Sequence, residues 1–265
     1  MKIFAKWIIL IFCISAVKIN AELLFKPFYA HVFEPRIGSL YQMDDEKLRL
    51  DIGYSHDLAK FELKSGKMAV GADFFTYTRL RSDGRFKFPV ETSDYFFGLN
   101  GSYITEIAGK ELGLRLRLSH ISSHLVDGYS SDGEFWKEPF TYSREFLEFS
   151  AGWYIFDNVR VYAGINYIFS SIPDDIEAIT PQFGFDAEMP INNSIELVCG
   201  FDHRTIGIDS EYAGANNFEG GVNFITSENA KISLFYSYYS GRSIHGMFYK
   251  EFDKYSSIGF KILFY

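Results

Sequence analysis

The segment RLRLSHISSHLVDGY, residues 115–129, places two histidines and three serines close together in the chain. On a helix, His120 and His124 would lie one turn apart and can share a metal ion. On a strand, their Cα atoms are four rises apart, roughly 13 Å, which is too far for one ion without a partner strand. His120 and Ser122 would instead share one face, about 7 Å apart, where a histidine base can activate a serine nucleophile. The secondary structure therefore decides which chemistry is available.

The residues before His120 alternate between apolar and polar side chains, which is the pattern of a strand. Similar alternation recurs in about twelve segments from residue 46 to the end of the chain. Tight turns such as Asp157-Asn158 alternate with longer polar connections, at 79–93, 125–142, 170–178, 205–215 and 241–253. Short turns at one end and long loops at the other are typical of an outer-membrane barrel, and a closed sheet satisfies every backbone group in lipid. The sequence therefore predicts an all-β fold, an antiparallel transmembrane β-barrel of about 12 strands.

A soluble periplasmic sandwich or lipocalin-like barrel is the alternative fold. Its outer face would be densely solvated, with Lys and Glu on every strand. The polar positions here are instead mixed with Gly, Ser, Asn and Tyr, which suits a narrow wet lumen. Aromatic residues make up 18% of the chain, more than a soluble core requires, and girdles of aromatic side chains are a feature of membrane barrels. The pattern favours the membrane barrel.

The first residues have the composition of a cleaved secretory signal. Two early lysines precede an apolar run from Trp7 to Val17, and Ala21 ends a passable cleavage site. We therefore expect residues 1–21 to be a signal peptide and residues 46–265 to form the barrel. Residues 22–45 are expected to be a periplasmic lead-in, a plug or part of the first hairpin. Only Cys199 remains after cleavage, so no intramolecular disulfide is expected.

Charge and localisation limit the partners. Cleavage removes Lys2, Lys6 and Lys18 and leaves 23 basic against 34 acidic residues, a net charge of −11, which argues against nucleic acid. The expected location is the cell outer membrane of a Gram-negative-type bacterium. The expected partners are outer-membrane lipids and lipopolysaccharide.

Glu145 can complete a catalytic arrangement. The strand after the 125–142 loop returns beside the first, and Glu145 shares parity with the apolar residues Leu147 and Trp153. If His120 lies opposite Glu145, the same register places Leu112 opposite Trp153. A Ser122–His120–Glu145 constellation is then available on the lipid-facing side, where the carboxylate orients the imidazole. The alternative role of His120, Ser122 and His124 is polar anchoring among lipid headgroups.

Other charged residues have weaker functional interpretations. The loop DGYSSDGE carries Asp127, Asp132 and Glu134, which can hold calcium at a loop tip or simply be solvated. We expect the residues of the last loop and of another rim to contact lipopolysaccharide at the surface: Arg242, His245, Asp202, His203 and Arg204. In the lumen, a neutralising network of charged side chains is expected from Arg115, Arg117 and Arg160 against Glu62, Glu196 and Asp202.

Several segments of the chain resemble one uncharacterised bacterial envelope family, the domain-of-unknown-function family twelve-oh-seven. These are Glu34-Pro35-Arg36, residues 120–127, Tyr142-Ser143-Arg144-Glu145 and residues 239–248. This resemblance implies no activity. The C-terminal residues 257–265 resemble the signal that the barrel-assembly machinery recognises, so this machinery is an expected partner during biogenesis.

His120-x-Ser122 at the end of a lipid-facing strand resembles outer-membrane phospholipase A and the lipid A deacylase PagL. Both families place a His-x-Ser pair on the outside of a barrel, and the deacylase orients its histidine with Glu, which Glu145 would match. Those families have Asn after the serine, whereas Ser123 stands here. The resemblance implies hydrolysis of an ester bond in a membrane lipid, with calcium near the site as in the phospholipase.

Three functions therefore remain open. The first is a structural or lipid-interacting envelope barrel without catalysis. The second is an outer-leaflet lipid acyl hydrolase that uses Ser122, His120 and Glu145. The third is a narrow pore, for which the charged lumen is the support.

Overall fold

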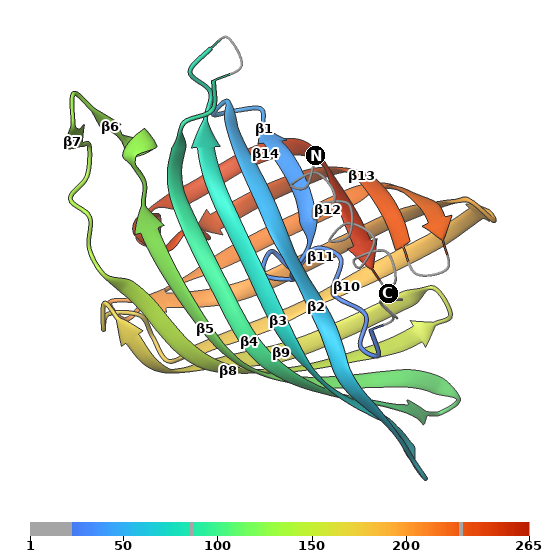
Figure 1. The fold of residues 1–265 in the computed structure, drawn as a ribbon. Helices are drawn as coiled ribbons and strands as arrows, with labels where there is room; N and C mark the ends of the chain where they lie inside the picture. Colours follow the sequence, from blue (N-terminus) through green and yellow to red (C-terminus); the bar gives the residue numbers. More distant parts are fainter. Residues whose placement is uncertain (1–22, 85–86, 228–229, 265) are drawn as a thin grey trace, which may run out of the picture.

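Twelve strands close into one antiparallel barrel in the computed structural model, which describes residues 23–84, 87–227 and 230–264 (Figure 1). The short strand β1 closes the sheet because it pairs with β2 on one side and β14 on the other. The expected signal peptide, residues 1–21, lies outside the described residues. The barrel strands are β1 (Ile37–Gln42), β2 (Lys47–Leu63), β3 (Gly66–Arg81), β4 (Val90–Ile107), β5 (Lys110–Leu125), β8 (Tyr142–Phe156), β9 (Val159–Ile172), β10 (Ile179–Asn192), β11 (Ile195–Ile208), β12 (Glu211–Ser227), β13 (Ala230–Arg242) and β14 (Phe252–Phe264). The predicted antiparallel barrel is confirmed.

The first two strands differ from the sequence pattern. The pattern treats the residues on either side of Leu58 as separate strands, but both belong to β2. A bulge between Asp57 and Ala59 inserts Leu58, and this extra residue shifts the phase of the alternation. The twelfth strand is β1, so the barrel begins at Ile37 rather than at residue 46.

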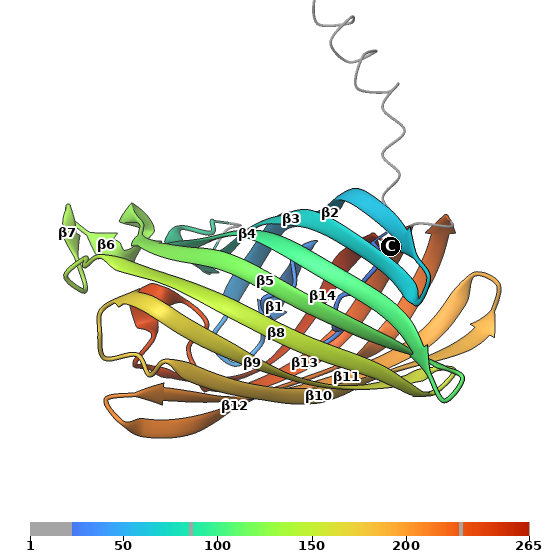
Figure 2. The same cartoon turned by 90° about the horizontal axis from the view of Figure 1, so that it is seen from below.

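The outer surface of the barrel is apolar. Large side chains that point outward are about half exposed, among them Ile52, Leu99, Leu116, Leu118 and Ile258. A closed sheet with such a belt is the structure that satisfies its backbone inside lipid. The protein is therefore an outer-membrane β-barrel, and Figure 2 shows the strands of its wall in a second view. Within the described ranges, no helix is long or apolar enough to cross a membrane.

Residues 23–36 fold back into the lumen, where Figure 1 shows the blue segment inside the barrel. Phe28, Ala30 and Val32 in this segment are buried, and the Phe28 ring stacks on Tyr162 of β9 at a centroid distance of 3.8 Å. We call residues 23–36 the plug. The sequence left three possibilities open for residues 22–45. Residues 23–36 form a plug, and Ile37–Gln42 form the first strand of the first hairpin.

Glu34 binds the plug to the barrel wall. Its carboxylate accepts hydrogen bonds from Arg115 Nη2 at 2.7 Å and from Arg117 Nη2 at 2.6 Å, and all three side chains are at most 4% exposed. Arg117 also lies 3.1 Å from Asp73, and Arg115 lies 3.3 Å from Glu148. Each of these buried charges therefore has a partner of opposite charge. An unpaired charge buried in the lumen would be unfavourable.

Further ion pairs fill the rest of the lumen. Arg36 of the plug contacts Asp51 at 2.6 Å, and Arg160 contacts Asp186 at 2.5 Å. The expected network therefore exists, but several of its acids differ from those expected. Glu62 lies at the exposed end of β2, 3.5 Å from Lys67, and outside the lumen. The plug and these ion pairs occupy part of the lumen.

The negative charge of Glu34 is predicted to contribute strongly to the free energy of unfolding. Glu34→Gln would leave Arg115 and Arg117 buried without their central carboxylate, and removal of one partner from a buried ion pair destabilises by about 3–5 kcal/mol. Urea unfolding of the detergent-refolded barrel, followed by tryptophan fluorescence, measures the change. Glu62→Gln removes an exposed pair and should lower the free energy of unfolding by about 1 kcal/mol or less. Equal effects of the two substitutions would contradict the central role of Glu34.

Candidate functional site

The register between β5 and β8 is the one that the triad requires. His120 lies opposite Glu145, and Leu112 lies opposite Trp153, as inferred from the sequence. Leu116 and Leu118 are about half exposed on the outer surface, and the His120 side chain continues this row with 40% exposure. His120 therefore faces outward, at the end of the barrel that carries the long loops.

His120 and Glu145 form a close pair. The Nδ1 atom of His120 lies 2.8 Å from Oε1 of Glu145, and Ser143 Oγ donates a hydrogen bond to the same oxygen at 3.0 Å. An ionised carboxylate only accepts, so Nδ1 carries the proton and Nε2 is the lone-pair nitrogen of the neutral ring. This is the tautomer in which a catalytic histidine acts as a base.

Ser122 lies on the same face as His120, two residues further along β5. It is half-buried, and its neighbours across the sheet are Tyr95 and Ser143. In the described part of the chain, Ser122 and His120 make no hydrogen bond to each other. The contact between His120 and the Glu145 carboxylate is therefore formed, and the contact between Ser122 and His120 is not. Catalytic hydrogen bonds are often long or missing in enzymes without substrate.

The side chains of the two metal interpretations are not grouped together in the described residues. His124 is exposed and packs against Tyr95 at a centroid distance of 5.8 Å, away from the His120–Glu145 pair. The described residues contain no cluster of three or more His, Cys, Asp or Glu side chains placed to hold a metal ion. The expected calcium ligands are therefore not gathered: Asp127 lies in a short 3-10 helix, η1 (Asp127–Tyr129), while Asp132 and Glu134 lie on a small hairpin of β6 (Ser130–Ser131) and β7 (Glu134–Phe135).

The loop between β13 and β14 differs most from the sequence expectation. His245 was expected at the surface, but it is 1% exposed, and its Nδ1 lies 2.7 Å from Oδ2 of Asp94. The Gly246 amide donates to the other oxygen of Asp94 at 2.8 Å, and Met247 donates to Ser123 Oγ at 3.1 Å. We call residues 243–251, which include the 3-10 helix η2 (Gly246–Phe248), the cap.

The cap covers the mouth of the barrel. Its apolar side chains point into the barrel and are buried there. Met247 and Phe248 are at most 1% exposed, and the Phe248 ring lies 3.6 Å beneath the Arg79 guanidinium. A Cβ at Gly246 would lie 2.4 Å from the Tyr142 ring, so only glycine permits this approach. The signal for this structure was the apolar run Gly246-Met247-Phe248-Tyr249 within a loop that was expected to be polar.

The other side of the cap is held at the surface. Tyr249 donates a hydrogen bond to Asp175 at 2.8 Å, and Lys250 forms ion pairs with Asp175 at 2.5 Å and Asp209 at 2.9 Å. Burial acts to raise the pKa of Asp175, but hydrogen bonds from Lys250 and Tyr249 outweigh it and hold this pKa below its ordinary value. Hydrogen bonds to Asp175 and Asp209 raise the pKa of Lys250. Both charges therefore persist across neutral pH.

The Asp175 contact gives the cap a predicted pH dependence. Because the pKa of Asp175 is lowered in the folded state, its contribution is present at neutral pH and is lost as the pH falls through that lowered pKa. Hydrogen exchange of the amides at 243–251, corrected for intrinsic rates, should stay slow to mildly acidic pH and then accelerate. Asp175→Asn should accelerate it at neutral pH. Its exposed neighbour supplies the control, since Asp174→Asn should leave exchange unchanged; acceleration in both variants would exclude the specific contact.

The fold is similar to known membrane barrels. Outer membrane phospholipase A from Escherichia coli superposes with a TM-score of 0.54 at 12% identity, covering 86% of this chain and 90% of that one. The Salmonella typhi outer membrane phospholipase dimer, a structure with bound calcium, gives 0.55 at 13% identity over 93% and 96% of the two chains. No curated protein matches the sequence. The model of the family "Protein of unknown function (DUF1207)" matches residues 83–264, and the chain therefore belongs to that family.

Proposed function

We propose that this outer-membrane barrel hydrolyses acyl esters of lipids in the outer leaflet. The observation that carries the proposal is the 2.8 Å contact between His120 Nδ1 and Glu145 on the lipid-facing surface. This contact fixes the imidazole in the base tautomer, with Ser122 on the same face of β5. The similarity to phospholipase A structures supports the same fold and adds no residue-level evidence.

Each residue has a defined role in the reaction. Ser122 Oγ attacks the ester carbonyl carbon while its proton passes to His120 Nε2. The tetrahedral intermediate collapses, the ester C–O bond breaks, and Nε2 returns the proton to the leaving alcohol. Water then attacks the acyl–serine bond by the same route and releases the fatty acid. Glu145 stabilises the imidazolium that forms in each step.

The position of this face fits a lipid substrate. His120 follows the outward apolar row of Leu116 and Leu118, so an acyl chain lying along the barrel brings its ester to the level of the imidazole. The His120 and Glu145 side chains are 40% and 32% exposed, which leaves the pair accessible from the lipid. A lumenal site would lack this access, because the wall of the closed barrel separates the lumen from the lipid.

A lipid-interacting barrel without catalysis is the second candidate. The observation that favours it is the missing hydrogen bond between Ser122 and His120 among the described residues. In that case His120, Glu145 and His124 anchor the barrel among polar headgroups.

Acyl release by the purified, detergent-refolded mature protein tests the hydrolase. Phospholipid and lipid A are the substrates, assayed with and without calcium. Ser122→Ala and His120→Ala are expected to lower the rate at least about 10³-fold, and Glu145→Gln about 10²–10⁴-fold, because the three side chains act as one unit.

Matched variants separate catalysis from lipid anchoring. His124→Gln changes a histidine on the same strand and face, and Ser131→Ala changes a serine in the exposed loop; both should retain activity. Wild-type protein that is folded, binds lipid vesicles and releases no acyl chain from any of these substrates would contradict the hydrolase and support the anchoring function.

A further inference from the structure

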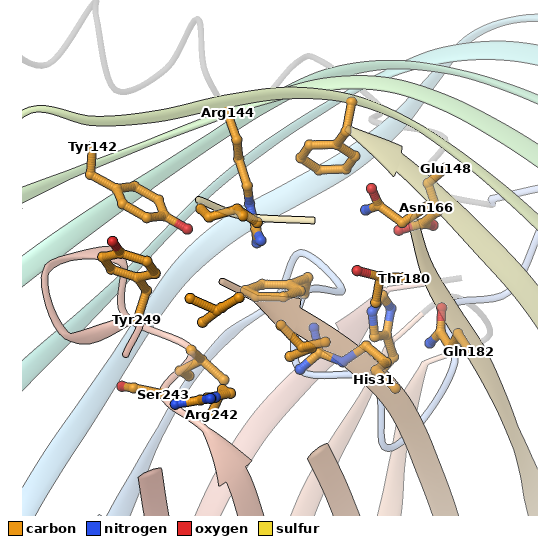
Figure 3. A pocket seen from close by; sticks show the side chains of 17 residues that line it. His31, Tyr142, Arg144, Glu148, Asn166, Thr180, Gln182, Arg242, Ser243 and Tyr249 are labelled. Atoms are coloured by element: carbon orange, nitrogen blue, oxygen red, sulfur yellow. The ribbon is translucent and has the colours of Figure 1, made fainter. Parts of the chain in front are cut away.

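A small cavity lies between the plug and the cap. Its volume is about 40 Å³, enough for a few water-sized groups. His31 and Phe33 of the plug form its inner side, and Ser243, Ile244 and Tyr249 of the cap form its outer side. Figure 3 shows Arg144 and Arg242 on opposite sides of this space, with His31 on a third side.

The charge of the cavity is positive. Three arginines line it, Arg144, Arg204 and Arg242, together with His31. The acidic residue of the lining is Glu148, which already lies 3.3 Å from Arg115 and 3.5 Å from Arg117. The cationic groups therefore exceed the carboxylates that face them.

Two of the three arginines, Arg144 and Arg242, make no ion pair with a described carboxylate, and the third, Arg204, pairs with Asp202. The Arg144 guanidinium lies 5.3 Å from the Phe33 ring centroid and has no ion pair with any described carboxylate. Arg242 Nη1 donates to the backbone oxygen of Lys250 at 2.7 Å. Arg204 Nε lies 3.5 Å from Asp202, and the other oxygen of Asp202 already accepts from Tyr162 at 3.0 Å and from Gln182.

Several buried polar atoms of the residues that line the cavity make no hydrogen bond. Within the described chain, the buried Nε atoms of Arg144, Arg204 and Arg242 make no hydrogen bond, and neither does His31 Nδ1, which lies 3.6 Å from Glu34 Oε1. His31 is 1% exposed and Arg204 is 6% exposed, so bulk water does not solvate them. Buried donors without acceptors are unfavourable, and the group that satisfies several converging cationic donors is an anion with several oxygens.

We propose that this cavity is a binding site for a phosphate group. A tetrahedral oxyanion presents acceptors in several directions, which matches guanidinium groups that enter from β8, β11 and β13 and the Thr180 hydroxyl on β10. The source is either inorganic phosphate or the phosphate of a lipid headgroup. Because the cavity is closed above by Tyr249 and Ile244, binding holds the cap on the plug. The site is separate from the lipid-facing His120–Glu145 pair, so it stands whether or not that pair is catalytic.

Titration calorimetry on the refolded, full-length mature barrel tests the site, with inorganic phosphate as the first probe and glycerol 3-phosphate as a headgroup probe. Chloride at matched ionic strength is the control salt. We expect saturable binding with one phosphate per barrel and a rise in the thermal unfolding midpoint that chloride does not produce. Binding of inorganic phosphate identifies the free ion as a ligand, and binding of glycerol 3-phosphate alone identifies the headgroup.

Variants locate the binding in the cavity. Arg144→Gln and Arg204→Gln should each weaken phosphate binding at least about tenfold, since each removes a charged donor. Lys137→Gln removes a charge outside the cavity, beside Glu251, and should bind phosphate as the wild type does. Arg144 has no ion pair, so its variant carries the test if Arg204→Gln does not refold. No saturable binding of either probe, or binding unchanged in Arg144→Gln, would overturn the proposal.

Discussion

The contact of Glu34 with Arg115 and Arg117 is the interaction on which the rest of the lumen depends. One carboxylate of the plug lies between two guanidinium groups of β5, and all three are almost completely buried. Charges in such a place are tolerated only as pairs, so the plug and the wall each require the other. The plug in turn supplies His31 and Phe33 to the cavity under the cap. The barrel wall therefore holds the plug, and the plug supports the cap.

The same strand serves both sides of the barrel. Successive side chains of β5 point to opposite faces, so Arg115 and Arg117 face the lumen while Leu116, Leu118 and His120 face the membrane. The inward ion pairs fix the position of the strand, and the cross-strand register then fixes His120 beside Glu145. The geometry of the outer face therefore rests on the electrostatics of the inner one.

The sequence predicted what short-range periodicity determines and missed what distant contacts determine. Alternation was enough to identify the lipid-facing row of β5, and one pairing, His120 with Glu145, correctly implied another, Leu112 with Trp153. The bulge at Leu58 made the single strand β2 look like two strands, because one inserted residue exchanges the two faces. The plug and the cap have no period at all. Their positions follow from contacts between residues far apart in the chain, such as Glu34 with Arg115 and His245 with Asp94.

Two histidine–carboxylate pairs in this protein have nearly the same geometry and different consequences. His120 lies 2.8 Å from Glu145 and His245 lies 2.7 Å from Asp94, each through Nδ1. The second pair is sealed: its side chains are at most 2% exposed, and Nε2 of His245 is buried without a partner. No ester can reach it, and Asp94 also accepts the Gly246 amide, so this pair holds the cap in place. The first pair is about one-third exposed at the lipid boundary, and a substrate can approach its free Nε2. The two pairs therefore differ in access rather than in the hydrogen bond itself, and the exposed position of His120 supports the proposal that it acts as the base.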